Sequence, residues 1–231
     1  MADNDEYVYE VIENLNDSRA CAQLLAEEFA ARNAIAVFDQ LTPQRFFNEV
    51  SWPILNDVLD EKLSFLARHR ASGEIVGAII ACDHYIMYQK HLNKTSASPA
   101  SIAVVDLFNE LDDIFINQDF GQQSKSNMVL HIIMGATRAH HSVKGVDRQL
   151  RVAMCNHARQ TKGFEYALAQ PINQDTRYIY LNEMNGKELS VIDPTTWLWK
   201  KTGNESAYPY ENYTGGCIPN ILVKLVSVGN A

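Results

Sequence analysis

A polar bend between an apolar strand and a helix is the segment of this sequence with the clearest chemical potential. The strand predicted over residues 128–136 leads into the bend, and Gly145 stands in the first turn of the helix that follows. Unpaired backbone N–H groups at such a helix start, with the positive end of the helix dipole, bind phosphate oxygens. The segment indicates a phosphate site, although any strand-to-helix turn can hold a glycine, and no dinucleotide or nucleoside triphosphate motif is present.

Histidines near this bend are candidates for a general base. His131 lies in the predicted strand, and His140 and His141 lie in the bend. An imidazole, with an unperturbed pKa of about 6.5, can take a proton from an ammonium group directly or through water. Alternation along the strand puts His131 on the same face as Gly135, where it either faces a substrate or is a hydrogen-bonded core residue. Histidines placed like His140 and His141 are more often solvated loop residues.

No metal is expected from these histidines. The spacing of His131, His140, His141 and His157 does not match a zinc motif. The four cysteines are scattered without a C-x-x-C pair, which indicates reduced thiols rather than a disulfide framework.

The elements that must position the bend are a mixture of strands and helices, as judged from apolar periodicity. Strands are predicted at residues 6–15, 63–69, 74–82, 128–136, 164–169, 187–192 and 221–226. Helices are predicted at residues 19–31, 43–58, 99–117, 145–161 and 173–184. Asp17-Ser18 is expected to cap the first helix and Thr42 the second, which Pro53 should kink or split.

Composition and charge exclude several classes of protein. The chain has 231 residues, 46% of them hydrophobic, so it can bury a core. Its 20 Lys and Arg against 28 Asp and Glu give a net charge of −8, which argues against nucleic acid and anionic membranes as partners. We find no secretory signal and no bilayer-spanning run, and we expect a cytoplasmic protein.

The charges are unevenly distributed along the sequence. Four basic residues cluster around the bend: Arg138, Lys144, Arg148 and Arg151. Residues 96–124 contain five acidic residues and no Lys or Arg: Asp106, Glu110, Asp112, Asp113 and Asp119. This pattern favours an anionic cofactor at the bend and a cationic substrate beside the acidic segment.

At the bend the chain resembles the GNAT superfamily of acetyl-CoA-dependent N-acyltransferases, and the resemblance covers nearly the whole chain. In that family the loop reads Q/R-x-x-G-x-G/A, which corresponds here to Ser142-Val143-Lys144-Gly145-Val146-Asp147. Only the middle glycine matches, because Ser142 stands where Gln or Arg is usual and Asp147 where a small residue is usual. Asp147 would repel a pyrophosphate unless the neighbouring basic residues compensate.

A narrower resemblance, to the arylalkylamine N-acetyltransferase-like branch, rests on residues 63–68, 73–78 and 111–115 taken together. It implies an α/β (α+β) fold of the GNAT type, with a mixed, mostly antiparallel, twisted sheet of about six or seven strands flanked by helices. It also implies a single domain over residues 1–231, with a helical insertion at about residues 84–127 before the central strand. A homodimer is one assembly that it allows.

The function that the resemblance implies is acetyl transfer from acetyl-CoA, as co-substrate, to a small primary amine that attacks directly in a ternary complex. The thioester is expected along the central strand at Gly135, Ala136 and Thr137, where backbone N–H groups polarise its carbonyl. The pyrophosphate is expected at Val143, Lys144, Gly145, Val146 and Arg148. Asn173 is expected to bond the pantetheine arm.

The resemblance leaves the catalytic acid and base incomplete. The family's tyrosine acid falls on Asn182, so Tyr178, one turn earlier, is the candidate, although Tyr178 and Tyr180 are equally read as core aromatics. The branch's glutamate base falls on Asn33, which leaves His131 as the candidate base. These departures support an alternative function, a GNAT-fold protein that has lost catalysis and binds acyl-CoA or a protein partner.

Overall fold

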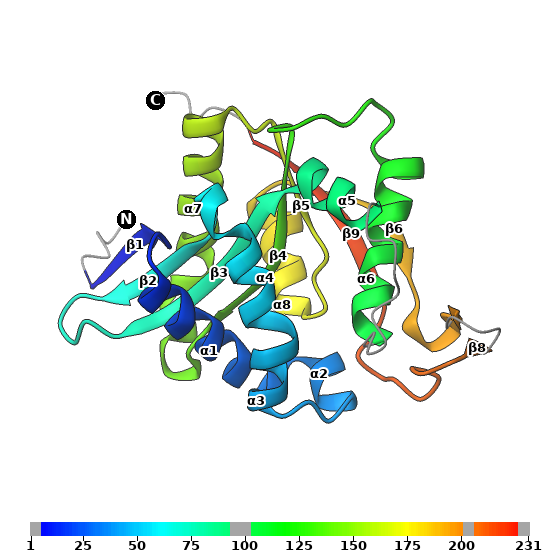
Figure 1. Ribbon diagram of the computed structural model, residues 1–231, viewed down its shortest axis with the longest axis horizontal. Coiled ribbons are helices and arrows are strands. Elements are labelled where there is room, and N and C mark those ends of the chain that lie inside the picture. The colour runs from blue at the N-terminus through cyan, green and yellow to red at the C-terminus, as the bar shows by residue number, and fades with distance from the viewer. Residues whose placement is uncertain (1–5, 93–102, 201–205, 226–231) are drawn as a thin grey trace.

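A mixed seven-stranded sheet forms the centre of the molecule (Figure 1). The computed structural model describes residues 6–92, 103–200 and 206–225. The strand order is β1-β2-β3-β4-β5-β9-β6, in which only β4 and β5 pair in parallel. The strands are β1 (Tyr7–Val11), β2 (Phe65–His69), β3 (Ile75–Asp83), β4 (Val129–Thr137), β5 (Tyr166–Ala169), β6 (Lys187–Ile192) and β9 (Ile218–Lys224). This confirms the fold class and all seven predicted strands.

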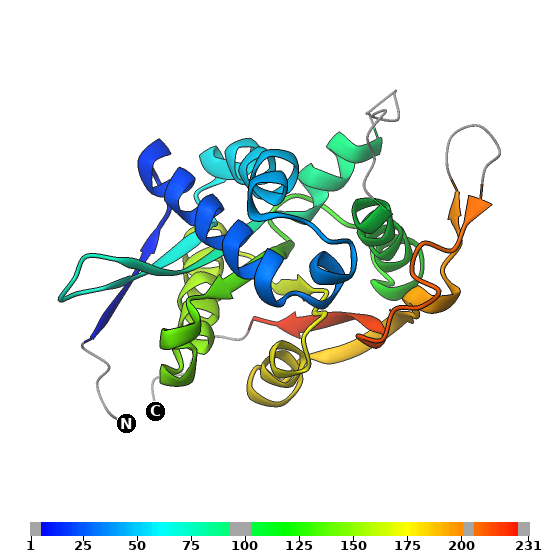
Figure 2. The same ribbon diagram turned by 90° about the horizontal axis from the view of Figure 1, so that it is seen from below.

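Helices cover both faces of the sheet, as Figure 2 shows, with α1 and α4 on one side and α7 and α8 on the other. The α-helices are α1 (Leu15–Arg32), α2 (Ala34–Phe38), α3 (Pro43–Phe46), α4 (Trp52–Val58), α5 (His84–Leu92), α6 (Ala103–Ile114), α7 (Val146–Lys162) and α8 (Gln174–Tyr178). Among the residues that the structure describes, no helix has the length and apolar composition needed to cross a bilayer.

Helix caps follow from short polar side chains. The first helix begins earlier than predicted, because Oδ1 of Asn14 accepts the backbone N–H of Asp17 at 2.9 Å, so the expected cap at Asp17-Ser18 is wrong. Thr42 caps α3 as predicted, with its hydroxyl accepting the backbone N–H of Arg45. A π-helical turn, Phe47–Ser51, then separates α3 from α4, which starts beside Pro53. The predicted splitting of this helix is confirmed.

Two apolar cores lie on opposite faces of the sheet. On one face, Leu150 and Met154 of α7 pack against the strands and are almost fully buried. On the other face, Leu24 and Leu25 of α1 are equally buried. Burying large apolar side chains of this kind contributes about 1.5–3 kcal/mol each. The sheet is therefore held rigidly between two helical layers.

The segment before β4 carries more helix than the sequence indicated. Helix α5 follows β3 directly and was not predicted, while α6 and a π-helical turn, Phe115–Asp119, correspond to the helix predicted at 99–117. The first residues of that prediction, 99–102, lie outside the described residues. A small ladder of β7 (Trp199–Lys200) and β8 (Ser206–Ala207) was also not predicted, because two-residue strands leave no periodic pattern.

A β-bulge in β4 overturns the simple alternation expected there. Ile80 pairs with Met134 and the next residue, Ala81, pairs with Ile132, so Ile133 is an extra residue on β4. Side chains of directly opposed residues share a face. His131, opposite Cys82, therefore faces the α1 side with Met134, whereas Gly135, opposite Ile79, faces α7. The prediction that His131 and Gly135 share a face is wrong.

Candidate functional site

A cleft of about 2220 Å³ opens where β4 and β5 separate. The two strands pair only from Val129↔Tyr166 to Ile132↔Ala169, after which β5 ends. Within the described residues, the backbone of residues 133–137 therefore has no strand partner on the β5 side. The cleft runs along this open edge from the start of α7 to the insertion helices α5 and α6.

The start of α7 forms one end of the cleft. Gly145 lines it and adopts a left-handed conformation, φ 72°, between a 3-10 segment, Ala139–Lys144, and the helix. No side chain caps the first turn, and an early backbone bond runs from the N–H of Gln149 to the carbonyl of Gly145. Backbone donors without a helical acceptor, at the positive end of the dipole, suit an anion.

The four basic residues near this turn are each paired with a carboxylate. Arg148 bonds Glu183 at 2.6 Å, and Lys144 bonds Glu6 at 2.5 Å. Likewise, Arg138 contacts Glu27, and Arg151, only 3% exposed, contacts Asp147. Only Arg148 and Arg151 line the cleft. The local field at the turn is therefore weaker than a count of basic residues indicates, because each charge has a nearby counter-charge.

The other residues predicted to contact a cofactor differ in whether their side chains reach the cleft. Gly135, Ala136, Thr137 and Asn173 line the cleft. Val146 is fully buried in the core below α7, so only its backbone is available. The side chain of Val143 lies outside the described residues.

Two of these residues show how a ligand could be held. The Oγ1 atom of Thr137 is buried and has no hydrogen-bond partner within the described residues, while its carbonyl accepts from Arg32 at 2.6 Å. A buried polar atom in a native fold normally has a partner, so this hydroxyl suits a ligand contact. The side-chain oxygen of Asn173 caps α8 by accepting the N–H of Asp175 at 2.7 Å, which fixes the side chain at the cleft wall.

His131 lies at the point where β4 and β5 meet, and Asp112 of α6 lies against it. The Nε2 atom of His131 is 3.7 Å from Oδ1 of Asp112, and Nε2 of His84 is 3.6 Å from the same oxygen. All three side chains are buried, and His131 and Asp112 line the cleft. Neither ring makes a hydrogen bond of normal geometry within the described residues. His131 is buried, as its reading as a core residue expects, and a side-chain interaction with Gln170 acts on its pKa.

The protonation states of this pair follow from burial and mutual charge. Burial lowers the pKa of His131, and the negative charge of Asp112 offsets only part of that effect. Burial alone would raise the pKa of Asp112, but His131 and His84 outweigh it and the pKa is lowered. At neutral pH the arrangement therefore holds a neutral imidazole beside an ionised carboxylate.

Hydrogen bonds fix the position of Asp112. The Nε2 atom of Gln170, just after β5, donates to Oδ1 of Asp112 at 2.9 Å and to Oδ1 of Asn220 at 3.0 Å. Asn220 of β9 in turn donates to the carbonyl of Leu111 at 2.9 Å. The carboxylate thus accepts one direct hydrogen bond, from Gln170, and Asn220 of β9 links Gln170 to α6 beside it, which limits its motion.

The two tyrosines of the helix after β5 have different environments. Tyr178, predicted as the acid, is 58% exposed and does not line the cleft. Tyr180 is 2% exposed and lines it, and its hydroxyl accepts from Nε of Arg151 at 3.0 Å. Burial raises the pKa of Tyr180 to about 12. Asn182 is exposed and donates to the carbonyl of Tyr178 at 3.3 Å.

The far end of the cleft is aromatic and acidic. Aromatic side chains from four elements line it: Phe29, Tyr85, Tyr88, Phe108 and Trp199. Of the acidic residues predicted to lie there, Asp106 and Asp112 line the cleft, whereas Asp113 bonds the hydroxyl of Tyr88 at 2.8 Å from outside it. Asn33 also lines the cleft, but its side-chain oxygen caps α2 by accepting the N–H of Ala36.

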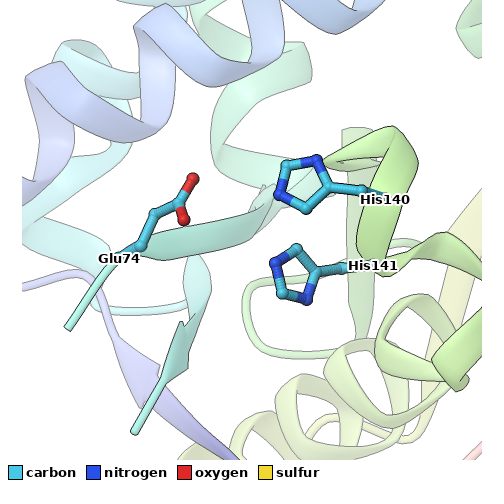
Figure 3. Close-up of side chains that lie close together, drawn as sticks. All are labelled: Glu74, His140 and His141. Carbon is cyan, nitrogen blue, oxygen red and sulfur yellow. The ribbon is translucent and has the colours of Figure 1, made fainter. Parts of the chain in front are cut away.

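Among the residues that the structure describes, two groups of side chains have a spacing suited to a metal ion. One is His84, Asp112 and His131 in the cleft wall, and the other is Glu74, His140 and His141 near the β2–β3 turn (Figure 3). His131 thus belongs to a different group from His140 and His141, which do not line the cleft. The sequence missed both groups because each combines residues from separate elements.

Comparison with known proteins gives results of two kinds. No protein-family model matches the sequence, and no curated protein matches it by sequence. Solved structures do match. The C-terminal condensation domain of Ebony in complex with beta-alanyl-dopamine superposes with a TM-score of 0.75 and 12% identity, over 94% of this chain and 98% of that one.

Two further matches are acetyltransferases. Mosquito arylalkylamine N-acetyltransferase like 5b has a TM-score of 0.70 and 11% identity, over 94% of this chain and 99% of that one. A Drosophila melanogaster polyamine N-acetyltransferase, which catalyses the formation of N-acetylagmatine, has a TM-score of 0.64 and 10% identity, with 94% and 99% covered. At these identities the likeness concerns the fold alone, and it confirms the predicted GNAT-type fold.

Proposed function

We propose that this chain, which has the fold of the GNAT N-acetyltransferases, transfers an acetyl group from acetyl-CoA to a small primary amine within a ternary complex. One observation carries the proposal: a single cleft joins the uncapped start of α7, the open edge of β4 and the His131–Asp112 pair. An acyl transfer needs an anion site for the cofactor, polarising donors for the thioester and a base for the amine.

Acetyl-CoA would lie along β4. Its pyrophosphate would meet the backbone N–H groups at Gly145 and the first turn of α7, with Arg148 at the edge, while Asn173 would contact the pantetheine arm. The thioester would lie beside Gly135, Ala136 and Thr137, where the unpaired edge of β4 can donate to the carbonyl oxygen. The unpartnered hydroxyl of Thr137 supports a ligand at this place.

In the proposed reaction, His131 takes a proton from the ammonium form of the substrate, and the free amine attacks the thioester carbonyl carbon. The tetrahedral oxyanion is stabilised by the β4 backbone donors. Its collapse breaks the carbon–sulfur bond, and the former amine nitrogen loses its second proton to water in the cleft, giving the acetamide and the thiolate of CoA. Ionised Asp112 stabilises the imidazolium that His131 becomes, which is the usual contribution of a carboxylate beside a catalytic histidine.

The thiolate needs a proton, and we assign its donor to Tyr180 in place of Tyr178. Tyr180 lines the cleft and Tyr178 does not. The guanidinium of Arg151, 3.0 Å from the phenol oxygen, would stabilise the phenolate left behind.

The acceptor would be a cationic amine with an aromatic or alkyl body. Asp106 and Asp112 supply negative charge at the far end of the cleft, and the aromatic side chains there supply apolar surface and faces for a cation. The similar Drosophila enzyme forms N-acetylagmatine, and the Ebony domain was solved with beta-alanyl-dopamine. Both are amine-derived molecules, which supports this substrate class.

The test has two stages. Thermal-shift titrations with acetyl-CoA and with CoA should each stabilise the protein, as any ligand of the folded state does. Release of free thiol from acetyl-CoA should then depend on an added primary amine. Tight binding without thiol release from any amine of the panel would instead support the alternative of a non-catalytic acyl-CoA-binding protein, and absence of both would refute the proposal.

The proposal includes a cytoplasmic location and a homodimer. All four cysteines, Cys21, Cys82, Cys155 and Cys217, are free thiols, which is usual in a reducing compartment. Fractionation of tagged protein and light scattering in solution test the two statements separately.

A further inference from the structure

The geometry points to a second site, outside the cleft, at which Glu74, His140 and His141 bind a divalent transition metal ion of the Zn²⁺ class. One ligand atom from each of these residues lies within 4.8 Å of the other two. Glu74 immediately precedes β3, and the histidines follow β4, so the site would join the β2–β3 turn to the segment that leads to Gly145 (Figure 1).

The backbone holds both halves of this site in place. The N–H of Arg138 donates to the carbonyl of Val76 at 2.7 Å, which ties the end of β4 to the start of β3. On the hairpin side, the N–H of His69 donates to the carbonyl of Glu74 at 2.9 Å. The N–H of His141 donates to the carbonyl of Arg138 at 2.9 Å. The three side chains therefore project from main chain that is already ordered.

The side chains converge. Figure 3 shows ring nitrogens of His140 and His141 turned toward the carboxylate of Glu74. In a tetrahedral zinc site, bond lengths of about 2.0–2.2 Å place neighbouring ligand atoms about 3.3–3.5 Å apart. Shortening the present distances between ligand atoms to these values needs side-chain movements of about an ångström. Glu74 and His140 are exposed and can make these movements.

Tyr7 orients the third ligand. Nδ1 of His141 lies 2.6 Å from the hydroxyl oxygen of Tyr7, and both side chains are buried. When Nδ1–H donates to that oxygen, Nε2 keeps its lone pair for a metal. A histidine ligand usually has an oxygen partner of this kind on its other nitrogen, which fixes the tautomer and the ring.

The donor set selects the class of ion. Two imidazole nitrogens and one carboxylate oxygen suit Zn²⁺ and related transition metals, whereas Mg²⁺ and Ca²⁺ prefer sites made only of oxygen. Three protein ligands leave a fourth position for water. Lys144, whose charge acts on His141, has its ammonium group 2.5 Å from Glu6, so its charge is largely compensated.

Titration of the full chain with Zn²⁺ alone, followed by calorimetry, tests the proposal. We expect one equivalent to bind, and Co²⁺ at the same site to give the visible absorption of a four-coordinate ion. Glu74→Gln and His140→Ala should each weaken binding at least about tenfold, because each removes one of three protein ligands. Tyr7→Phe, which keeps the packing, should weaken it by about 10–100-fold.

Two control variants locate the ion. His157→Ala removes a partly exposed histidine elsewhere, whose Nε2 lies 3.1 Å from the carbonyl of Lys62, and should leave the affinity unchanged. Cys217→Ser removes the exposed thiol and should also have no effect. Failure to bind Zn²⁺, or binding that survives Glu74→Gln and His140→Ala, would overturn the proposal. Loss of binding in His84→Ala alone would instead assign the ion to the buried cleft-wall group.

Discussion

Asp112 and His131 come from different elements, α6 and β4, yet Oδ1 of the aspartate lies 3.7 Å from Nε2 of the histidine in the wall of the cleft. Within the described residues, the imidazole has no hydrogen bond of normal geometry. A neutral imidazole has a lone pair that can accept a proton, and a carboxylate beside it stabilises the imidazolium that results.

Replacing the base should separate catalysis from cofactor binding. His131→Gln keeps a polar side chain of similar size but cannot take a proton, so kcat/KM for the amine should fall about 10²–10⁴-fold. The affinity for CoA, measured by thermal shift, should stay the same because the phosphate end of the cleft is intact. Unchanged kcat/KM would remove His131 from the mechanism.

The pH dependence of the reaction should report the environment of His131. Because burial lowers its pKa, the acidic limb of the kcat/KM profile should lie below the ordinary value of about 6.5. Asp112→Asn removes the charge that raises this pKa, so the limb should move to still lower pH. A limb that stays in place in this variant would show that Asp112 does not act through His131.

The same lowered pKa affects stability. The unfolded chain binds a proton at His131 more readily than the folded chain does. The contribution of neutral His131 to the free energy of unfolding is therefore complete above a pH of about 6.5, and it is lost as the pH falls through the lower pKa of the folded state. Urea unfolding between pH 7.5 and 5 should therefore show a steeper loss in the wild type than in His131→Gln. These pH values lie about one unit above and about one and a half units below that ordinary pKa.

The phosphate assignment rests on Gly145 and has a matched control in the same helix. Gly145→Glu should lower the affinity for acetyl-CoA at least about tenfold, since a carboxylate would repel the phosphates at close range. Gly163→Glu, at the other end of α7, should leave this affinity unchanged. Gly163 has a left-handed φ of 78°, similar to the 72° of Gly145. Both variants carry the same backbone strain. Calorimetric titration with acetyl-CoA distinguishes them, and equal affinities would refute the assignment.

The two tyrosines form a second matched pair. Tyr180→Phe should lower kcat at saturating amine, because it removes the proposed proton donor for the thiolate. Tyr178→Phe should leave kcat unchanged, because this side chain is exposed and outside the cleft. Tyr180→Phe also leaves Nε of Arg151 without its acceptor and should cost about 1–3 kcal/mol of stability. A wild-type rate in a correctly folded Tyr180→Phe would exclude it as the acid.

Charge at the acceptor end can be tested with two acidic residues of α6. Asp106 and Glu110 each accept an indole N–H at 2.7 Å, from Trp199 and Trp197 respectively, but only Asp106 lines the cleft. Asp106→Asn should raise KM for a cationic amine by about fivefold, for roughly 1 kcal/mol of lost attraction. Glu110→Gln should not change KM. Equal effects would indicate a general, long-range contribution of charge.

Local sequence patterns predicted the framework of the site well. The sequence predicted the apolar runs that form β3 and β4, the Thr42 cap and the glycine before α7. These features could be predicted because strand alternation and capping depend on neighbouring residues. Helix α5 was missed: its residues follow β3 without a break, and its amphipathic pattern is weak.

The arrangement of the candidate site depends on contacts between residues that are far apart in the sequence. The bulge at Ile133 changed the face of His131, and nothing in the apolar pattern of β4 marks one extra residue. The four basic residues near Gly145 proved to be ion-paired, three of them with acidic residues far away in the sequence.

By itself, the sequence determined the order of elements and the glycine at the start of α7, because these follow from local periodicity and backbone preference. The fold class followed from the resemblance to a known family. Only the tertiary structure decided which side chains meet. It brought Asp112 to His131, placed Tyr180 rather than Tyr178 on the cleft wall, and set Glu74 beside His140 and His141. The physical reason is that such contacts are set by strand register and by the packing of helices on a sheet, which join residues remote in sequence.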